Sequence, residues 1–341
     1  MPSMDIFEGD AFSLRSLTDA INKIKFVPGW LSARGIFNAN GIPTDTAMIE
    51  EKNGVLSLIS PTPRGGPGQT LDKGKRALRP ITIPHFEIND AVMAIEVQGI
   101  RAFGSETETE TVQGKVAERL GIATQSLAAT EEYARIGAVK GVVTYADGST
   151  LDLFDVFDVS QIGELDMNLD SSADDGSLRE DCAGIVRTIA GELDGTPFSG
   201  VTALCSDSFY DALIKNKEVR GTYLNQAEAA QLRGGYVDNG GAGIFGSFNF
   251  GGIDWFNYRG AVGGVSFIDA DKAHFFPTGV PGLFRTLYGP ADYEETVNTM
   301  GLARYARQYA MPNGKGRNLD SQMNSLNICT RPRVLLKGKI T

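Results

Sequence analysis

The sequence has few of the residues from which catalytic and metal sites are usually built. It contains three cysteines and two histidines in 341 residues, and no two cysteines form a CxxC pair. This spacing favours neither a zinc knuckle nor a disulfide framework, so we expect Cys182, Cys205 and Cys329 to be reduced thiols that fill the core. His85 and His274 lie far apart, and no P-loop, HExxH or GxSxG motif occurs. We therefore expect no enzyme, no cofactor and no metal.

Long hydrophobic runs are also missing. No stretch approaches the roughly 20 apolar residues that a helix needs to cross a bilayer. The first ten residues lack the basic and then apolar pattern of a signal peptide. We therefore expect a protein that is made in a cytosol and has no membrane partner.

Two partial motifs do not support a ligand site. Residues 241–246 fit GxGxxG. A dinucleotide site also requires a strand before this motif and a helix after it, and the sequence indicates neither. Residues around Gly176 resemble a calcium loop, yet Cys182 stands where the bidentate acid belongs. We interpret both segments as loops.

Charge is divided sharply along the chain. The composition is typical of a globular protein, with 42% hydrophobic and 22% charged residues, although 41 glycines predict many turns. The net charge of −10 disfavours a dedicated nucleic-acid binder. Residues 151–181 carry ten acids and one base, whereas residues 64–79 carry five bases and one acid. From residue 304 onward there are eight bases and one acid.

The first half of the sequence predicts an arm, a ribbon and a long helix. Short apolar runs broken by glycine and proline indicate an arm with little core of its own over residues 1–45. Extended segments at 48–60 and 77–86 flank a tip rich in glycine and proline, which predicts a two-stranded ribbon that must lie on something else. A capping box at Ser105 and Glu108 then begins a helix that we expect to end near Ile136.

The second half predicts mixed elements. An Asp147-Gly148 step favours a type I′ hairpin between strands at 139–145 and 150–154. Ser177 with Glu180 forms a second capping box, a short strand follows at 201–205, and Asp207 is expected to cap another helix. A helical segment is expected at 293–309 and a terminal strand at 326–336. This order of elements predicts an α+β fold.

Several strings along the chain resemble the lambda-like major capsid protein E family of tailed phages. The resemblance extends from about residue 28 to residue 336. Its strings are Pro28-Gly29-Trp30-Leu31, the segment 130–141 (TEEYARIGAVKG), Tyr145-Ala146-Asp147-Gly148-Ser149, Ile253-Asp254-Trp255, residues 273–279, Leu283-Phe284, Pro290-Ala291-Asp292, Val297-Asn298-Thr299 and residues 328–332.

The resemblance implies the Hong Kong 97-type capsid fold. It divides the chain into an N-terminal arm (1–45), an extended loop (46–84), a peripheral domain with a long spine helix (85–176 and 293–341) and an axial domain (177–292). It implies a major capsid protein in the virion that forms hexamers and pentamers, which close into an icosahedral head around double-stranded DNA. A decoration protein, a scaffold protein and a portal are the partners expected by resemblance. No long charged prodomain is apparent, so a separate scaffold is expected. DNA contact should be weak and non-specific.

We hypothesise that the basic ribbon of one subunit lies against acidic residues of a neighbour. The predicted contact residues are Arg64, Lys73, Lys75, Arg76, Arg79, Glu106, Glu108, Glu110, Asp152, Asp155 and Asp158. The alternative is that these charges are merely solvated faces. The basic C-terminal stretch faces either DNA or an acidic neighbour. Rival functions are a nanocompartment (encapsulin-like) shell around cargo protein, an enzyme, and a phage tail or neck protein.

Overall fold

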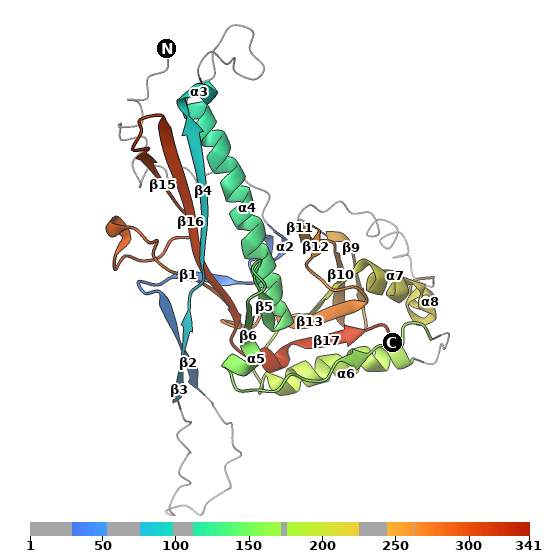
Figure 1. Ribbon diagram of the computed structural model, residues 1–341. Coiled ribbons are helices and arrows are strands. Elements are labelled where there is room, and N and C mark those ends of the chain that lie inside the picture. The colour runs from blue at the N-terminus through green and yellow to red at the C-terminus, as the bar shows by residue number, and fades with distance from the viewer. Residues whose placement is uncertain (1–28, 53–75, 98–111, 172–175, 225–243, 263) are drawn as a thin grey trace, which may run out of the picture.

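The computed structural model describes residues 29–52, 76–97, 112–171, 176–224, 244–262 and 264–341. Within these ranges the chain forms two large sheets, a long helix beside the first, and a two-stranded ribbon (Figure 1). This arrangement confirms the expected α+β class. No described helix is both long and apolar enough to cross a membrane.

The first sheet has five strands and is centred on a long strand near the C-terminus. β16 (Gly316–Cys329) pairs antiparallel with β4 (His85–Met93), β15 (Tyr305–Ala310) and β14 (Phe284–Tyr288). β1 (Asn38–Gly41) adds a parallel edge strand to β14. Residues from both ends of the sequence therefore share one sheet.

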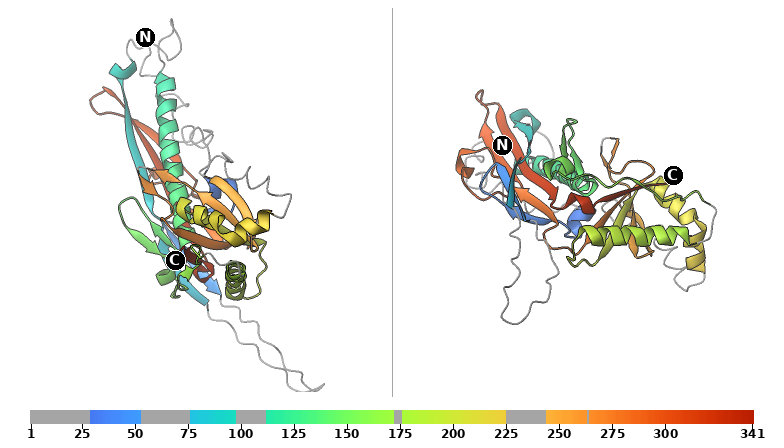
Figure 2. Two further views of the ribbon diagram at one scale, coloured as in Figure 1. Left: turned by 90° about the vertical axis from the view of Figure 1, so that its right-hand side faces the viewer. Right: turned by 90° about the horizontal axis from the view of Figure 1, so that it is seen from below.

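The long helix α4 (Val112–Lys140) runs alongside β4 and β16 (Figures 1 and 2). Its 29 residues span about 44 Å at 1.5 Å per residue. Val116, Leu120, Ala123 and Leu127 recur at intervals of three or four residues and are all buried, so they form one apolar stripe and the predicted helix is confirmed. The helix extends past the expected end to Lys140, and Gly141 follows with a φ of 87°. The capping box predicted at residues 105–108 lies outside the described residues.

The second sheet has six strands. Their order is β7 (Leu165–Asp166), β17 (Leu336–Lys339), β13 (Lys272–Thr278), β8 (Gly200–Cys205), β10 (Ile253–Tyr258) and β9 (Ile244–Phe250). Helices α6 (Ser177–Glu192), α7 (Asp207–Lys215) and α8 (Lys217–Leu224) lie at this end of the molecule. The strand predicted at 201–205 is confirmed as β8. The core beside this six-stranded sheet centres on Trp255, whose ring packs against Phe209 and Phe275.

Short elements connect these parts. They are α2 (Trp30–Ala33), β2 (Thr46–Lys52), β3 (Arg76–Thr82), α3 (Ala94–Val97), β5 (Val142–Thr144), β6 (Thr150–Asp152), α5 (Leu153–Val156), β11 (Ala261–Val262), β12 (Val265–Ser266), η3 (Glu294–Thr296) and η4 (Pro332–Val334). β2 and β3 pair antiparallel from Thr46↔Thr82 to Lys52↔Arg76, which agrees with the base of the predicted ribbon. The tip of the ribbon lies outside the described residues.

The β5–β6 hairpin has a different turn from the one expected. A type I′ turn requires positive φ at both central residues. Gly148 has a φ of 84°, but Asp147 is not among the residues with positive φ, so the predicted turn type is wrong. Instead the Gly148 amide donates to the Tyr145 carbonyl, and Asp147 accepts from the Ser149 amide. The carboxylate thus stabilises a longer loop in which only glycine takes the left-handed conformation.

The helix predicted at residues 293–309 is wrong. This segment contains the single turn η3 and then β15, whose Tyr305 pairs with Gln322 of β16. Gly301 packs directly on the backbone of β14 in place of a helical turn, since a Cβ there would lie 2.1 Å from the Tyr288 carbonyl oxygen. The terminal strand predicted at 326–336 is also divided. β16 ends at Cys329, Pro332 begins η4, and β17 continues into the other sheet.

The expected caps of two helices need correction. At α6 the N-cap residue is Gly176, which has no side chain that could cap the helix. The carboxylate of Glu218, on α8, instead accepts from the amides of Leu178 and Arg179 at 3.2 and 3.3 Å. At α7 the N-cap is Ser206, which accepts from the Phe209 amide, and Asp207 lies in the first turn. Local spacing could not reveal a cap supplied from 40 residues away.

Candidate assembly surfaces

Four of the predicted contact residues lie around the short helix α5. Arg79, on β3, donates from Nη1 to the carbonyl oxygen of Val156 at 2.7 Å. Asp152 caps α5 by accepting from the Phe154 amide at 2.8 Å. Asp155 and Asp158 are exposed beside them. The base of the ribbon is therefore anchored on the acidic segment of its own chain through Arg79.

The other predicted contact residues are not placed by the structure. Arg64, Lys73, Lys75, Glu106, Glu108 and Glu110 lie outside the described residues, and Arg76 is described only as part of the backbone of β3. The contact between the basic ribbon and a neighbouring subunit stays a prediction.

Two further acids of residues 151–181 are paired within the chain. The Glu164 carboxylate lies 2.7 Å from Lys272 Nζ and 3.6 Å from Lys337 Nζ, and Asp166 lies 3.4 Å from Lys339 Nζ. The hydrogen bond from Lys272 holds the pKa of Glu164 below its usual value. These bonds join β7 to β13 and β17. Two bases of the C-terminal stretch thus face acids of their own chain.

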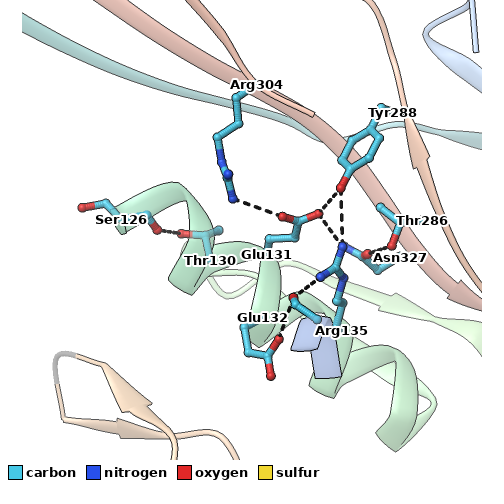
Figure 3. A network of polar contacts seen from close by, with 10 residues as sticks. Ser126, Thr130, Glu131, Glu132, Arg135, Thr286, Tyr288, Arg304 and Asn327 are labelled. Atoms are coloured by element: carbon cyan, nitrogen blue, oxygen red, sulfur yellow. Dashed lines mark hydrogen bonds and ion pairs between the residues drawn. The ribbon is translucent and has the colours of Figure 1, made fainter. Parts of the chain in front are cut away.

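A buried polar network lies on the C-terminal half of α4 (Figure 3). Glu131 accepts from Tyr288 Oη at 2.6 Å, from Arg135 Nη2 at 2.8 Å and from Arg304 Nη2 at 3.3 Å. All three charged residues are at most 7% exposed. A buried carboxylate between two guanidinium groups is satisfied from three directions, and removing one partner would leave an uncompensated charge. The network links α4 to β14 and to the segment before β15.

The adjacent Glu132 holds the start of the described chain. Its Oε1 accepts from the Leu31 amide at 2.9 Å and its Oε2 accepts from Ser32 Oγ at 3.3 Å, so it caps α2 from a distance of 101 residues. Tyr258 Oη also donates to it at 3.4 Å. A Cβ on Gly29 would lie 2.1 Å from the carboxyl carbon of Glu132. Burial raises the pKa of Glu132 above its usual value.

This joint connects α4 to α2 and to β10, yet no motif in the sequence marks its residues as partners. Gly29 and Glu132 both lie in strings quoted for the family resemblance, and the structure shows why they belong together. The glycine leaves the space that the carboxylate fills. The signal was present, but it was split between two strings about 100 residues apart.

Exposed apolar side chains gather in two places. Val297, Met300 and Leu302 are 47–65% exposed on the segment between η3 and β15. Val262 and Val265 are 54% and 53% exposed on the β11–β12 hairpin. Apolar groups in such clusters are typical of surfaces that another polypeptide covers.

The three thiols and the imidazole of His274 are buried. Cys182, Cys205 and Cys329 are buried free thiols, as predicted, and burial raises the pKa of Cys182 and of Cys329 to about 12. His274 is 2% exposed, and burial lowers its pKa to about 3, so it is neutral. No cluster of three metal-binding side chains occurs among the described residues. These groups contribute to packing.

The fold is shared with solved phage capsids. A prophage protein of E. coli CFT073, assigned as a capsid protein, matches with a TM-score of 0.57 at 14% identity, over 96% of this chain and 99% of that one. The capsid of Ralstonia phage GP4 matches with a TM-score of 0.52 at 10% identity, over 91% and 88%. The long helix, the paired base of the ribbon and the two sheets therefore show the fold of Hong Kong 97-type phage capsid proteins.

The sequence comparisons identify the family. Residues 13–340 match the family described as phage major capsid protein E, and the chain belongs to it. The major capsid protein of Pseudomonas phage KPP10 is 27% identical over 96% of this chain and 97% of its own length. That of Salmonella phage Felix O1 is 26% identical over 96% of each. The expectation of a tailed-phage major capsid protein, a component of the virion capsid, is confirmed.

Proposed function

We propose that the chain assembles into hexamers and pentamers that close into an icosahedral head around double-stranded DNA. The observation that carries this proposal is the match to the capsid family over nearly the whole chain, together with the shared shell-subunit fold. Synthesis takes place in the host cytoplasm, and the partners are a scaffold protein, a portal and a decoration protein, as in the family resemblance. DNA is contacted weakly and without sequence preference, in keeping with the net charge of −10.

The division of the chain into arm, loop, peripheral and axial domains belongs to the same proposal. The five-stranded sheet with α4 forms the peripheral part, and the six-stranded sheet with α6 and α7 forms the axial part. Two strands refine the expected boundaries. β14 lies in the peripheral sheet, and the C-terminal β17 lies in the axial sheet. The chain crosses between the parts more often than its sequence order indicates.

Ring formation requires that one surface of a subunit meets a different surface of the next. The basic ribbon tip and the exposed carboxylates of Asp155 and Asp158 are complementary surfaces of this kind. Exposed ion pairs contribute only about 0.2–1 kcal/mol each, so they select the partner and its register, while apolar contacts supply most of the binding. Val297, Met300 and Leu302 form a cluster of exposed apolar residues suited to that role.

A nanocompartment around cargo protein is the alternative with the same fold. The family match and both curated relatives favour the phage head. Sedimentation of the purified chain at increasing concentration tests assembly. Species that correspond to capsomers or closed shells support the proposal, whereas a monomer at every concentration, with or without a scaffold protein, contradicts it.

A further inference from the structure

An apolar groove opens on one side of α4. Its cavity of about 380 Å³ lies between α4 and the β5–β6 and β11–β12 hairpins. The lining side chains are small or aromatic: Ser126, Ala129, Thr130, Tyr133, Tyr145, Val262, Val265 and Phe267. The two valines of the rim are more than half exposed. Because water contact with apolar surface costs about 25 cal/mol per Å², this surface favours a covering segment.

The apolar face of α4 extends beyond the groove. Ile122, which is 55% exposed, precedes Ser126 by four residues, and Ala129 and Tyr133 follow at intervals of three and four. This spacing places all four on one side of the helix. From Ile122 to Tyr133 the strip is about 16 Å long at 1.5 Å per residue. It is long enough to hold several side chains in a row.

The start of the described chain lies beside this groove. Gly29 is held against Glu132, which accepts a hydrogen bond from Tyr258. The Tyr258 ring lies 6.2 Å from that of Phe267, a wall of the groove, and Phe267 lies 4.9 Å from Tyr133. The Glu132–Tyr258 hydrogen bond and one ring contact therefore connect the anchored end of the chain to the wall of the cavity.

We propose that this groove binds residues 20–28 of the same chain, through the apolar side chains of Ile21, Ile24 and Phe26. Five extended residues between Gly29 and Ile24 reach about 17 Å, whereas Ser126 lies only about 9 Å along the helix from Glu132. A tether this short gives an effective concentration in the millimolar range, so the chain's own segment is favoured over a free partner. The contact is intramolecular and does not depend on shell formation.

A disulfide test separates the possible occupants. Ile24→Cys with Ser126→Cys should give, on oxidation of the full chain, a disulfide within one chain, at about fivefold or more the yield of the pair Ile24→Cys with Gln125→Cys. Gln125 is the matched control, because it is exposed on α4 but does not line the cavity. The native cysteines are buried and do not compete. Equal yields from the two pairs, or disulfide-linked dimers, would overturn the proposal.

Proteolysis gives an independent readout, because trypsin cleaves after Lys23 and Lys25. Ala129→Glu places a charge in the groove and should speed these cleavages about tenfold, which corresponds to about 1.4 kcal/mol. Gln125→Glu should leave them unchanged. Cleavage after the buried Arg135, followed in the same digest, reports general unfolding. Unchanged cleavage after Lys23 and Lys25 with a folded Ala129→Glu chain would contradict the proposal.

Discussion

At the scale of single residues, two neighbouring carboxylates on α4 have different partners and stabilise different contacts. Glu131 is neutralised by Arg135 and Arg304, whereas Glu132 accepts from a backbone amide and two hydroxyl groups. The first joins α4 to the five-stranded sheet, and the second fixes α2. A sequence shows two adjacent acids at these positions, and only the folded arrangement distinguishes their partners.

The close packing of Gly29 against Glu132 predicts how a substitution of Gly29 changes stability. Gly29→Ala should destabilise the chain by about 1–3 kcal/mol, because the new methyl group overlaps the carboxylate. Gly121→Ala is the matched control, since nothing lies within 4 Å of the added Cβ and the position is helical. It should stabilise the chain by about 0.5–1 kcal/mol. Urea unfolding of the two variants measures both, and equal effects would contradict the packing argument.

The raised pKa of Glu132 predicts a pH dependence. Because the folded state binds this proton more tightly than the unfolded state, the contribution of Glu132 to stability is fully present below its ordinary pKa of 4.5. It is lost as the pH rises through the higher pKa of the folded state. Glu132→Gln removes this titration, so the wild type should lose stability relative to the variant as the pH is raised from 4.5. Denaturant midpoints from pH 4 to 7 measure this, and parallel curves for the two proteins would contradict it.

At the scale of elements, the sequence predicted what depends on local spacing. The buried stripe of α4, the strand β8 and the paired base of the ribbon follow from periodicity and from turn residues. The segment 293–309 has helical spacing but forms a turn and a strand, because Gly301 packs directly on the backbone of β14 and Tyr305 pairs with β16. Long-range pairing decides such segments, and no local pattern records it.

The cap of α6 illustrates the same limit and can be tested. Glu218→Ala should destabilise the chain by about 0.5–2 kcal/mol, because the amides of Leu178 and Arg179 lose their acceptor. Glu180→Ala, which removes the residue that a local capping box would use, should have little effect. Hydrogen exchange in the first turn of α6 measures the difference. Faster exchange in Glu180→Ala than in Glu218→Ala would restore the local capping box.

At the scale of the whole molecule, some charges are paired within the chain and others are left exposed. Glu164 and Asp166 are paired within the chain, and Arg79 anchors the ribbon on α5. Exposed carboxylates at Asp155 and Asp158 lie beside that anchor. The contact residues could be predicted only as a charge pattern, because charge spacing in a sequence does not distinguish partners in the same chain from partners in the next.

A charge exchange tests the contact between subunits. Lys73→Glu with Lys75→Glu should lower the yield of assembled particles, and so should Asp155→Lys with Asp158→Lys, because each set places like charges together. The four changes combined should restore assembly. The effects should weaken as salt rises. Normal yield from each set alone would show that these charges are solvated faces.

The central claim is that this chain forms the shell of a phage head. A cryo-electron microscopy reconstruction of particles assembled from the purified chain, with a scaffold protein if one is needed, tests it most directly. We predict closed shells of hexamers and pentamers in which α4 and both sheets fit the density of every subunit. A persistent monomer, or particles whose subunit density does not accommodate this fold, would contradict the claim.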